Sequence, residues 1–435
     1  MNMITSKADT PGIPGQKYPW LWVPSIYLAE GIPYMIAMTV SVVLYKNLGL
    51  SNTEIALYTS WLYLPWVIKP LWSPFIDLFR TKRFWIVLMQ LAIGASLACV
   101  ALTLPASDFV KYTLAMFWIM AFSSATHDVA ADGYYMLALD TPRQAAFVGV
   151  RTLFYRIATI ASKGGLVVLA GYLMQNGHSV KSAWSITFLF AAAVFLALCL
   201  YHFFILPAPE TDRSAPLDKS RGVVKEYFRI ITLFFRRKDI LIVISFFLFY
   251  RFAEAQLVKM VAPFLLDARE KGGLGLSTAE VGIIYGTVGV VALMLGGLLG
   301  GYAIYRHGLK FWLWPMVLIM NVPDLIFVYL SHAQPENIWL IGAALAVEQF
   351  GYGFGFTAYT MYMIMVAQGE YKTVFYAMGT GIMALGMMLP AMSSGWIQEM
   401  LGYKNFYFWI LITTIPGFIV AALVKIDPAY GKKAG

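Results

Sequence analysis

Two aspartates one helical turn apart stand inside an apolar stretch of this chain. Asp128 and Asp132 lie within residues 109–138, a segment long enough to cross a bilayer. The spacing of four residues places both carboxylates on one face of a helix. A charge at the middle of a membrane costs about 2.5–3.5 kcal/mol unless it is paired or hydrated. We therefore expect this face to point toward a protein interior or a water-filled cavity, as in a carrier with many spans.

Two arginines in the next apolar segment match these aspartates in depth. With a rise of about 1.5 Å per residue, Arg151 lies at the level of Asp132, and Arg156 lies at the level of Asp128. We predict the ion pairs Asp132–Arg151 and Asp128–Arg156. Each pair also has a purely structural interpretation, as a strut between two helices. For the deeper pair we favour a functional role, in which Arg156 binds a carboxylate of the cargo and protonation of Asp128 releases it.

The composition is that of a membrane protein. Of 435 residues, 60% are hydrophobic and only 13% are charged, and the mean hydropathy is +0.68. Soluble domains carry about 25% charged residues. The net charge of +9 is accounted for by lysines and arginines retained in cytoplasmic loops, so we expect no nucleic-acid partner. Cys99 and Cys199 fall in apolar segments and provide no disulfide framework.

Twelve apolar segments have the length of a membrane span, about 20 residues or more. They are residues 20–45, 54–79, 84–105, 109–138, 144–171, 180–206, 239–266, 279–304, 311–331, 338–367, 372–398 and 403–425. With both termini on the cytoplasmic side, 20 of the 32 lysines and arginines fall in inner loops and tails and 6 in outer loops. This distribution is the bias expected for that orientation.

The two halves of the chain repeat each other. Leu48–Ile55 (LGLSNTEI) matches Leu274–Val281 (LGLSTAEV) at an offset of 226 residues. Both strings carry Ser-x-x-Glu before an apolar run, which predicts a capping box at a helix start. Two halves of six helices in the same orientation are the parallel repeat of a major-facilitator carrier, whose substrate site lies between the halves.

The predicted fold class is therefore an all-α membrane protein with twelve transmembrane helices in two six-helix halves. Its predicted parts are a cytoplasmic tail (1–19), the N-terminal half (20–206), a cytoplasmic linker (207–238), the C-terminal half (239–425) and a second cytoplasmic tail (426–435). The basic linker includes an amphipathic stretch around 223–235, which we expect to form a helix on the membrane surface.

Four strings, all in the first half, resemble one branch of the major facilitators. They are Glu30-Gly31-Ile32-Pro33, the pattern LPxxxKxLWxPxxD over Leu64–Asp77, the pattern SATxDxAxDxY over Ser124–Tyr134, and Tyr155-Arg156. This branch contains the muropeptide permease AmpG and is related to acetyl-coenzyme A transporters. The resemblance implies proton-coupled import of peptidoglycan breakdown products, either anhydro-muropeptides or N-acetylmuramic acid and other amino sugars, across a bacterial inner membrane. It also implies an inner gate that contains Asp77 and Arg80.

Carboxylates in the middle of apolar segments are the candidate proton carriers, because burial disfavours the charged form of the group. They are Glu30, Asp128, Glu254 and Glu348. Each has an ordinary alternative. Glu30 has Tyr27 and Tyr34 within one turn as hydrogen-bond partners, and Glu254 has Arg251 three residues before it as a neutralising charge. Glu348 opens the glycine-rich run 351–355, which we expect to serve close helix packing.

Bases and aromatic residues in the same segments are the candidate substrate ligands. We select Lys69, Tyr155, Arg156, Arg251 and Tyr352. Lys69 matches Asp128 in depth, so a simple ion pair is its alternative. Most aromatic side chains in such a chain face lipid or the core. Lys163 is a second buried base, which either contacts an anionic ligand or simply pairs with an acid. For Lys259 and Asp324 we predict only satisfied partners.

The predicted function is a transporter that works by alternating access with protons and a small molecule in the lipid bilayer, as a monomer, without cofactor or metal. The alternatives are a major facilitator that carries another anionic cargo, such as a sugar acid, a peptide or an acyl-coenzyme A, and a membrane-embedded acyltransferase. In an acyltransferase, His127 and Asp128 would act as a general base. The sequence has no nucleophile motif, phosphate loop or metal-ligand spacing to support an enzyme.

Overall fold

The computed structural model describes residues 19–209, 212, 217–368 and 371–432, and within these it contains helices and no strands. The predicted tail 1–19 therefore lies outside the described residues except for Pro19. The all-helical prediction is confirmed for the described chain.

In the described chain the first half comprises eleven consecutive helical elements. They are α1 (Pro19–Met35), η1 (Ile36–Val40), α2 (Ser41–Asn47), α3 (Asn52–Trp61), α4 (Leu64–Leu78), α5 (Lys82–Thr103), α6 (Phe109–Ala138), α7 (Thr141–Thr159), η2 (Ile160–Leu166) and α8 (Val167–Gln175), followed by α9 (Val180–Ile205). The elements η1 and η2 are single π-helical turns inside longer helices. A π-helical turn contains one extra residue and is frequent at functional sites.

The second half follows a connecting helix, α10 (Leu217–Phe235). Its elements are α11 (Ile240–Phe249), α12 (Phe252–Leu266), η3 (Arg269–Lys271), α13 (Thr278–Ile283), η4 (Ile284–Val288), α14 (Gly289–His307), α15 (Leu309–Asn321), η5 (Val322–Asp324), α16 (Leu325–Ala333), α17 (Ile338–Ala367), α18 (Lys372–Thr413) and α19 (Ile415–Leu423). α18 consists of two helices joined at Gly402, whose φ of 70° is not helical.

Eight helical stretches of the described chain are long and apolar enough to cross a membrane. They are Pro19–Asn47, Lys82–Thr103, Pro142–Gln175, Val180–Ile205, Ile240–Leu266, Thr278–His307, Leu309–Ala333 and Val374–Leu423. α6 and α17 are single helices of 30 residues that fall outside these eight. The number twelve and the side on which each terminus lies stay predictions.

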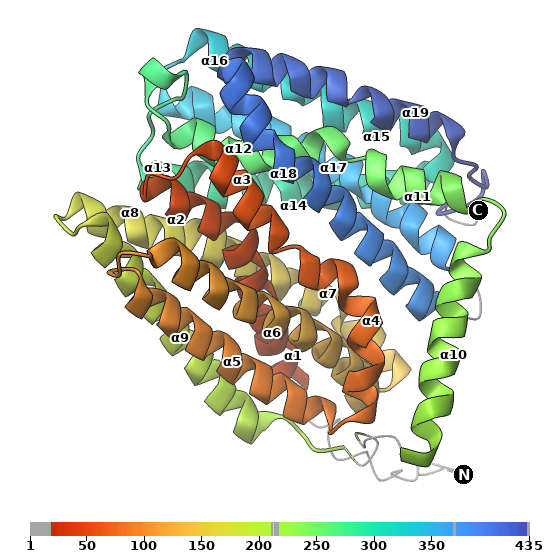
Figure 1. The fold of residues 1–435 in the computed structure, drawn as a ribbon. Coiled ribbons are helices and arrows are strands. Elements are labelled where there is room, and N and C mark those ends of the chain that lie inside the picture. The colour runs from red at the N-terminus through yellow and green to blue at the C-terminus, as the bar shows by residue number, and fades with distance from the viewer. Residues whose placement is uncertain (1–18, 210–211, 213–216, 369–370, 433–435) are drawn as a thin grey trace, which may run out of the picture.

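The two halves lie side by side, and α10 runs along both of them (Figure 1). The Tyr227 hydroxyl of α10 is 3.0 Å from Ser73 Oγ of α4. On the other side, Phe234 of α10 packs against Phe375 of α18, with ring centroids 5.4 Å apart. The amphipathic stretch predicted around 223–235 is thus a helix that contacts both halves. Its position on the membrane surface stays a prediction.

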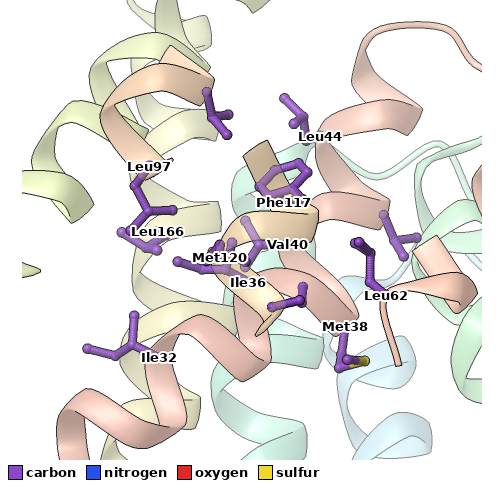
Figure 2. Packing of buried hydrophobic residues seen from close by; sticks show 14 of the residues in the cluster. Ile32, Ile36, Met38, Val40, Leu44, Leu62, Leu97, Phe117, Met120 and Leu166 are labelled. Carbon is purple, nitrogen blue, oxygen red and sulfur yellow. The ribbon is translucent and has the colours of Figure 1, made fainter. Parts of the chain in front are cut away.

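The core of the first half gathers around the π-helical turn η1. Ile36 and Val40 of η1 pack with Phe117 and Met120 of α6 and with Leu166 of η2, and all of these side chains are buried (Figure 2). The same apolar cluster continues into buried residues of α12 and α18 from the second half. Outward-facing large apolar side chains such as Leu241 and Trp339, 78% and 85% exposed, suit contact with lipid.

The repeated strings begin equivalent helices, as predicted. The Ser51 hydroxyl accepts a hydrogen bond from the Glu54 N–H, and the Glu54 carboxylate accepts one from the Ser51 N–H. Ser277 and Glu280 make the same reciprocal pair at the start of α13. Both capping boxes are confirmed, and each fixes the start of a helix after a glycine-containing turn.

Candidate functional site

The polar face of α6 makes two ion pairs with neighbouring helices of the first half. Lys69 Nζ of α4 lies 2.5 Å from Asp128 Oδ2, and both side chains are largely buried. Arg151 Nη2 of α7 lies 2.9 Å from Asp132 Oδ1. Tyr27 of α1 donates a hydrogen bond of 2.9 Å to the same oxygen of Asp132. Four helices therefore converge on the two aspartates that are one turn apart.

The predicted contact between Asp132 and Arg151 is confirmed, whereas the contact predicted between Asp128 and Arg156 is wrong. Asp128 pairs with Lys69 instead. Depth alone could not decide between the two bases, because both lie near the level of Asp128. The decision depends on which face of α4 and α7 turns toward α6, and this is a property of tertiary packing.

Glu30 of α1 is the third carboxylate of this group. Its Oε2 is buried and has no hydrogen-bond partner among the described residues. It lies within electrostatic range of Asp128, Asp132, Lys69 and Arg151. Three carboxylates thus share two bases, and the unmatched negative charge falls on the group without a partner. A buried uncompensated charge is costly, so a cation or proton is favoured there.

Tyr155 and Arg156 of α7 lie where the two halves meet. α1 and α7 approach closely, since a Cβ on Gly31 would lie 2.7 Å from Ala158 Cβ and 3.0 Å from the Tyr155 carbonyl oxygen. Arg156 makes no ion pair within the described chain, and it is close enough to Tyr352 of α17 for electrostatic interaction. It is therefore an arginine with free donors beside the opposite half.

Arg251 and Tyr352 form the facing group of the second half. Arg251, the residue before α12, donates a hydrogen bond to the Tyr352 hydroxyl. Its guanidinium carbon lies 5.1 Å from the centroid of the Tyr352 ring and 4.5 Å from that of Phe356. Arg251 and Glu254, whose mutual neutralisation is the alternative to a proton-coupling role for Glu254, form no ion pair within the described residues, although they lie in electrostatic range of each other. Arg251 is held by aromatic faces and keeps a buried, unpartnered Nε.

Glu254 and Glu348 lie deeper in the second half. Glu348 accepts hydrogen bonds of 3.0 and 3.3 Å from the Gln349 side-chain amide. One oxygen each from Glu254, Asp324 and Glu348 lies within 4.8 Å of the others, so these three could hold a metal ion. The packing role predicted for the glycine-rich run is supported at Gly353, where a Cβ would lie 2.1 Å from the Leu293 carbonyl oxygen.

The predicted inner gate is only partly described. The side chain of Asp77 in α4 lies outside the described residues. Arg80, just after α4, is exposed and has a φ of 67°, and its guanidinium carbon lies 5.8 Å from the centroid of the Phe84 ring. The role predicted for these two residues stays a prediction.

Sequence reasoning missed several polar contacts. Lys46 and Asp267, which follow the first span of each half, form an ion pair of 2.7 Å between the halves. His127, predicted as a possible base, is fully buried and lies 3.0 Å from the Gln90 amide, which also contacts His202. Lys46 and Asp267 both precede the matched strings, which begin at Leu48 and Leu274, but they are not at equivalent positions of the repeat, so the sequence carries no direct signal for their contact.

Comparisons with known proteins show which family and which relatives the chain resembles. The pattern of the Major Facilitator Superfamily matches residues 25–389. The anhydromuropeptide permease of Escherichia coli K12 is 22% identical over 365 residues, which cover 83% of this chain and 70% of the permease. A Rickettsia conorii protein named as an AmpG transporter is 23% identical over 420 residues, covering 90% of this chain and 93% of that protein.

Solved structures show the same fold at low identity. A D-xylose-proton symporter matches with a TM-score of 0.71 and 13% identity, covering 96% of this chain and 99% of the symporter. The nucleoside transporter NupG matches with a TM-score of 0.68 and 15% identity, covering 93% of this chain and 99% of NupG. These relatives and neighbours are transporters, which agrees with the prediction of a transporter rather than an enzyme.

Proposed function

The chain belongs to the major facilitator superfamily, and from this premise we propose that it imports peptidoglycan breakdown products across a bacterial inner membrane together with protons. The cargo would be an anhydro-muropeptide, N-acetylmuramic acid or a related amino sugar. The observation that carries the proposal is the unequal charge count of the first half, where Glu30, Asp128 and Asp132 share Lys69 and Arg151. The name of the Escherichia coli relative supports the class of cargo.

Protons would enter at Glu30 and at the pair formed by Asp128 and Lys69. Glu30 has a buried oxygen without a partner, so it gains most from protonation. Protonating Asp128 would release Lys69 and allow α4 to move relative to α6. This exchange would couple proton binding to the rocking of the two halves. The same proton-carrying role for Glu254 and Glu348 is the alternative in the second half.

The cargo would bind between Arg156 of the first half and Arg251 of the second. N-acetylmuramic acid carries a free lactyl carboxylate. In a cargo with a stem peptide, that carboxyl is amide-linked to the peptide, and the peptide supplies the free carboxylates. Arg156 has donors free for bidentate recognition of a carboxylate. Tyr155, Tyr352 and Phe356 offer aromatic faces for sugar rings. A carboxylate that bridges both arginines would draw the halves together and favour the transition.

Uptake into proteoliposomes tests this proposal. We expect labelled anhydro-muropeptide or N-acetylmuramic acid to accumulate under an inward proton gradient and accumulation to collapse with a protonophore. Arg156→Gln should raise KM by about tenfold or more, since a charge-assisted hydrogen bond contributes about 1.5–3 kcal/mol. The matched control is Arg306→Gln, which removes an exposed arginine that donates a hydrogen bond to the Tyr302 hydroxyl. This variant should leave KM unchanged.

The result that would overturn the proposal is a folded protein that accumulates neither sugar. A sugar acid, a peptide and an acyl-coenzyme A would then be tested as competing cargos in the same vesicles. Uptake that persists with the protonophore would reject proton coupling while leaving the cargo class in place.

A further inference from the structure

Three buried carboxylates from different elements meet in the second half. Glu254 of α12, Asp324 at the end of η5 and Glu348 of α17 are each no more than 2% exposed. One oxygen from each lies within 4.8 Å of the others. We call these three residues the carboxylate triad. Its members are 70 and 24 residues apart in the chain, so only the tertiary fold brings them together.

Most oxygens of the carboxylate triad lack donors. Glu254 Oε1 and Asp324 Oδ1 are buried and have no hydrogen-bond partner among the described residues. The Tyr407 hydroxyl, in electrostatic range of Glu348, is likewise buried and without a partner. Only Glu348 is served, by the neighbouring Gln349 amide. Unmet buried acceptors are costly, and a group of converging lone pairs is what a cation binds.

The charges around the triad leave one negative charge uncompensated. Two bases are in electrostatic range of Glu254, namely Lys163 of η2 and Arg251. Neither forms an ion pair with the triad in the described chain. Lys163 Nζ lies 3.1 Å from the centroid of the Tyr285 ring, and Arg251 donates to Tyr352. Three carboxylates against two bases require one further positive charge.

The spacing of the oxygens is compatible with a hard cation that all three carboxylates share. Hard cations bind carboxylate oxygens, and Ca²⁺ does so at about 2.3–2.6 Å, which puts ligands on opposite sides of the ion about 4.6–5.2 Å apart. The triad oxygens fall within this spacing. Na⁺ has nearly the same radius as Ca²⁺ and carries the single charge that the count requires.

We propose that Glu254, Asp324 and Glu348 together bind Na⁺, and that Asp324 contacts the ion directly. The ion would lie among α12, η5 and α17 and would face Lys163 of the opposite half. The effect of sodium on transport rests on the function proposed above. Sodium bound here would change how readily η2 approaches the second half. Binding itself does not depend on transport and is measured separately.

Sodium binding to the purified full-length protein in lipid nanodiscs is the direct test. Radioactive sodium in choline chloride buffer should bind saturably and be displaced by NaCl but not by choline. Asp324→Asn and Glu348→Gln should each weaken binding by about tenfold or more, as expected for the loss of a charged ligand. Asp108→Asn removes an exposed carboxylate paired only with Lys111 and should leave binding unchanged.

The melting temperature of each variant without sodium shows whether it is folded. The proposal is overturned if the wild type binds no sodium saturably, which is also the result for a triad that holds only protons. It is equally overturned if folded Asp324→Asn and Glu348→Gln bind as the wild type does. Sodium binding without uptake of any sugar would contradict the transport proposal alone, and uptake without sodium binding would contradict this one alone.

Discussion

The ion pair between Lys69 and Asp128 is the contact on which the proposed proton-coupling mechanism depends. Both groups are largely buried at 18% and 15% side-chain exposure. Removing one partner of such a pair leaves an uncompensated charge and costs about 3–5 kcal/mol, whereas replacing both partners is often neutral. The pair can therefore be examined by comparing single and double substitutions.

We expect Asp128→Asn to lower the melting temperature and to abolish accumulation driven by a proton gradient. Lys69→Gln combined with Asp128→Asn should recover most of the stability, because no buried charge is left unpaired, but should not recover accumulation. Thermal unfolding and proteoliposome uptake measure the two effects. Recovery of proton-driven accumulation in the double variant would contradict a role for Asp128 in coupling.

The sequence predicted the positions of site residues correctly where spacing along a helix and depth in the membrane were sufficient to determine them. The shared face of Asp128 and Asp132 follows from their spacing, and the pair of Asp132 with Arg151 follows from depth. The partner of Asp128 and the approach of Asp324 to Glu254 depend on helix rotation and on elements far apart in the chain. Depth along the helices offers Lys69 as an alternative partner for Asp128 but does not choose between Lys69 and Arg156. The sequence carries no direct signal for the approach of Asp324 to Glu254.

At the scale of elements, the halves touch through glycines on η2 and α8 and on α13 and η4. A Cβ on Gly171 of α8 would lie 2.3 Å from the Ala279 N atom, and a Cβ on Gly286 of η4 would lie 2.2 Å from the Lys163 carbonyl oxygen. Helices approach this closely only where side chains are absent. These contacts make η2 and η4, which is also π-helical, a close-packed joint between the halves.

We predict that Gly171→Ala destabilises this arrangement by about 1–3 kcal/mol, as overpacking of a filled interface does. Gly165→Ala in the neighbouring π-helical turn is the control, because its Cβ would meet no atom within 4 Å. Thermal unfolding in nanodiscs should show a lower melting temperature for the first variant and no loss for the second. Equal melting temperatures for both would contradict a packed joint at Gly171.

At the scale of the whole molecule, the sequence predicted the repeat and the capping boxes because both are local patterns. The comparisons and the all-helical structure agree with the superfamily that the repeat indicated. Eight stretches of the described chain satisfy the length and apolarity criteria, and α6, which carries Lys111, Asp128 and Asp132, falls outside them. How the halves meet depends on contacts between distant residues, such as Lys46 with Asp267.

A polar network holds the two halves together near the repeated strings. This region lies at the end of the molecule away from α10 (Figure 1). Lys46 Nζ lies 2.7 Å from Asp267 Oδ1 and donates to Asn52 Oδ1 at 2.8 Å. Asn52 donates to Gln398 at 2.6 Å, and the Tyr403 hydroxyl donates to Asp267 at 2.6 Å. The lysine and arginine distribution predicts that this end faces outward, so the network would keep the outer side closed.

We predict that Asp267→Asn shifts the population toward an outward-open state, because it removes the charge that Lys46 holds across the halves. A reporter cysteine, Ala56→Cys, would sit one turn below Asn52, where Ala56 is fully buried and packs beneath Gly395. Its labelling by a membrane-impermeant maleimide should accelerate by about tenfold, corresponding to the loss of a charge-assisted hydrogen bond.

The protein used for this labelling would have Cys99 and Cys199 replaced by serine. Asp108→Asn, an exposed carboxylate predicted to lie on the same side, should not change the rate. An unchanged rate in Asp267→Asn would mean that apolar packing and the glycine joint, rather than this network, keep the outer ends together.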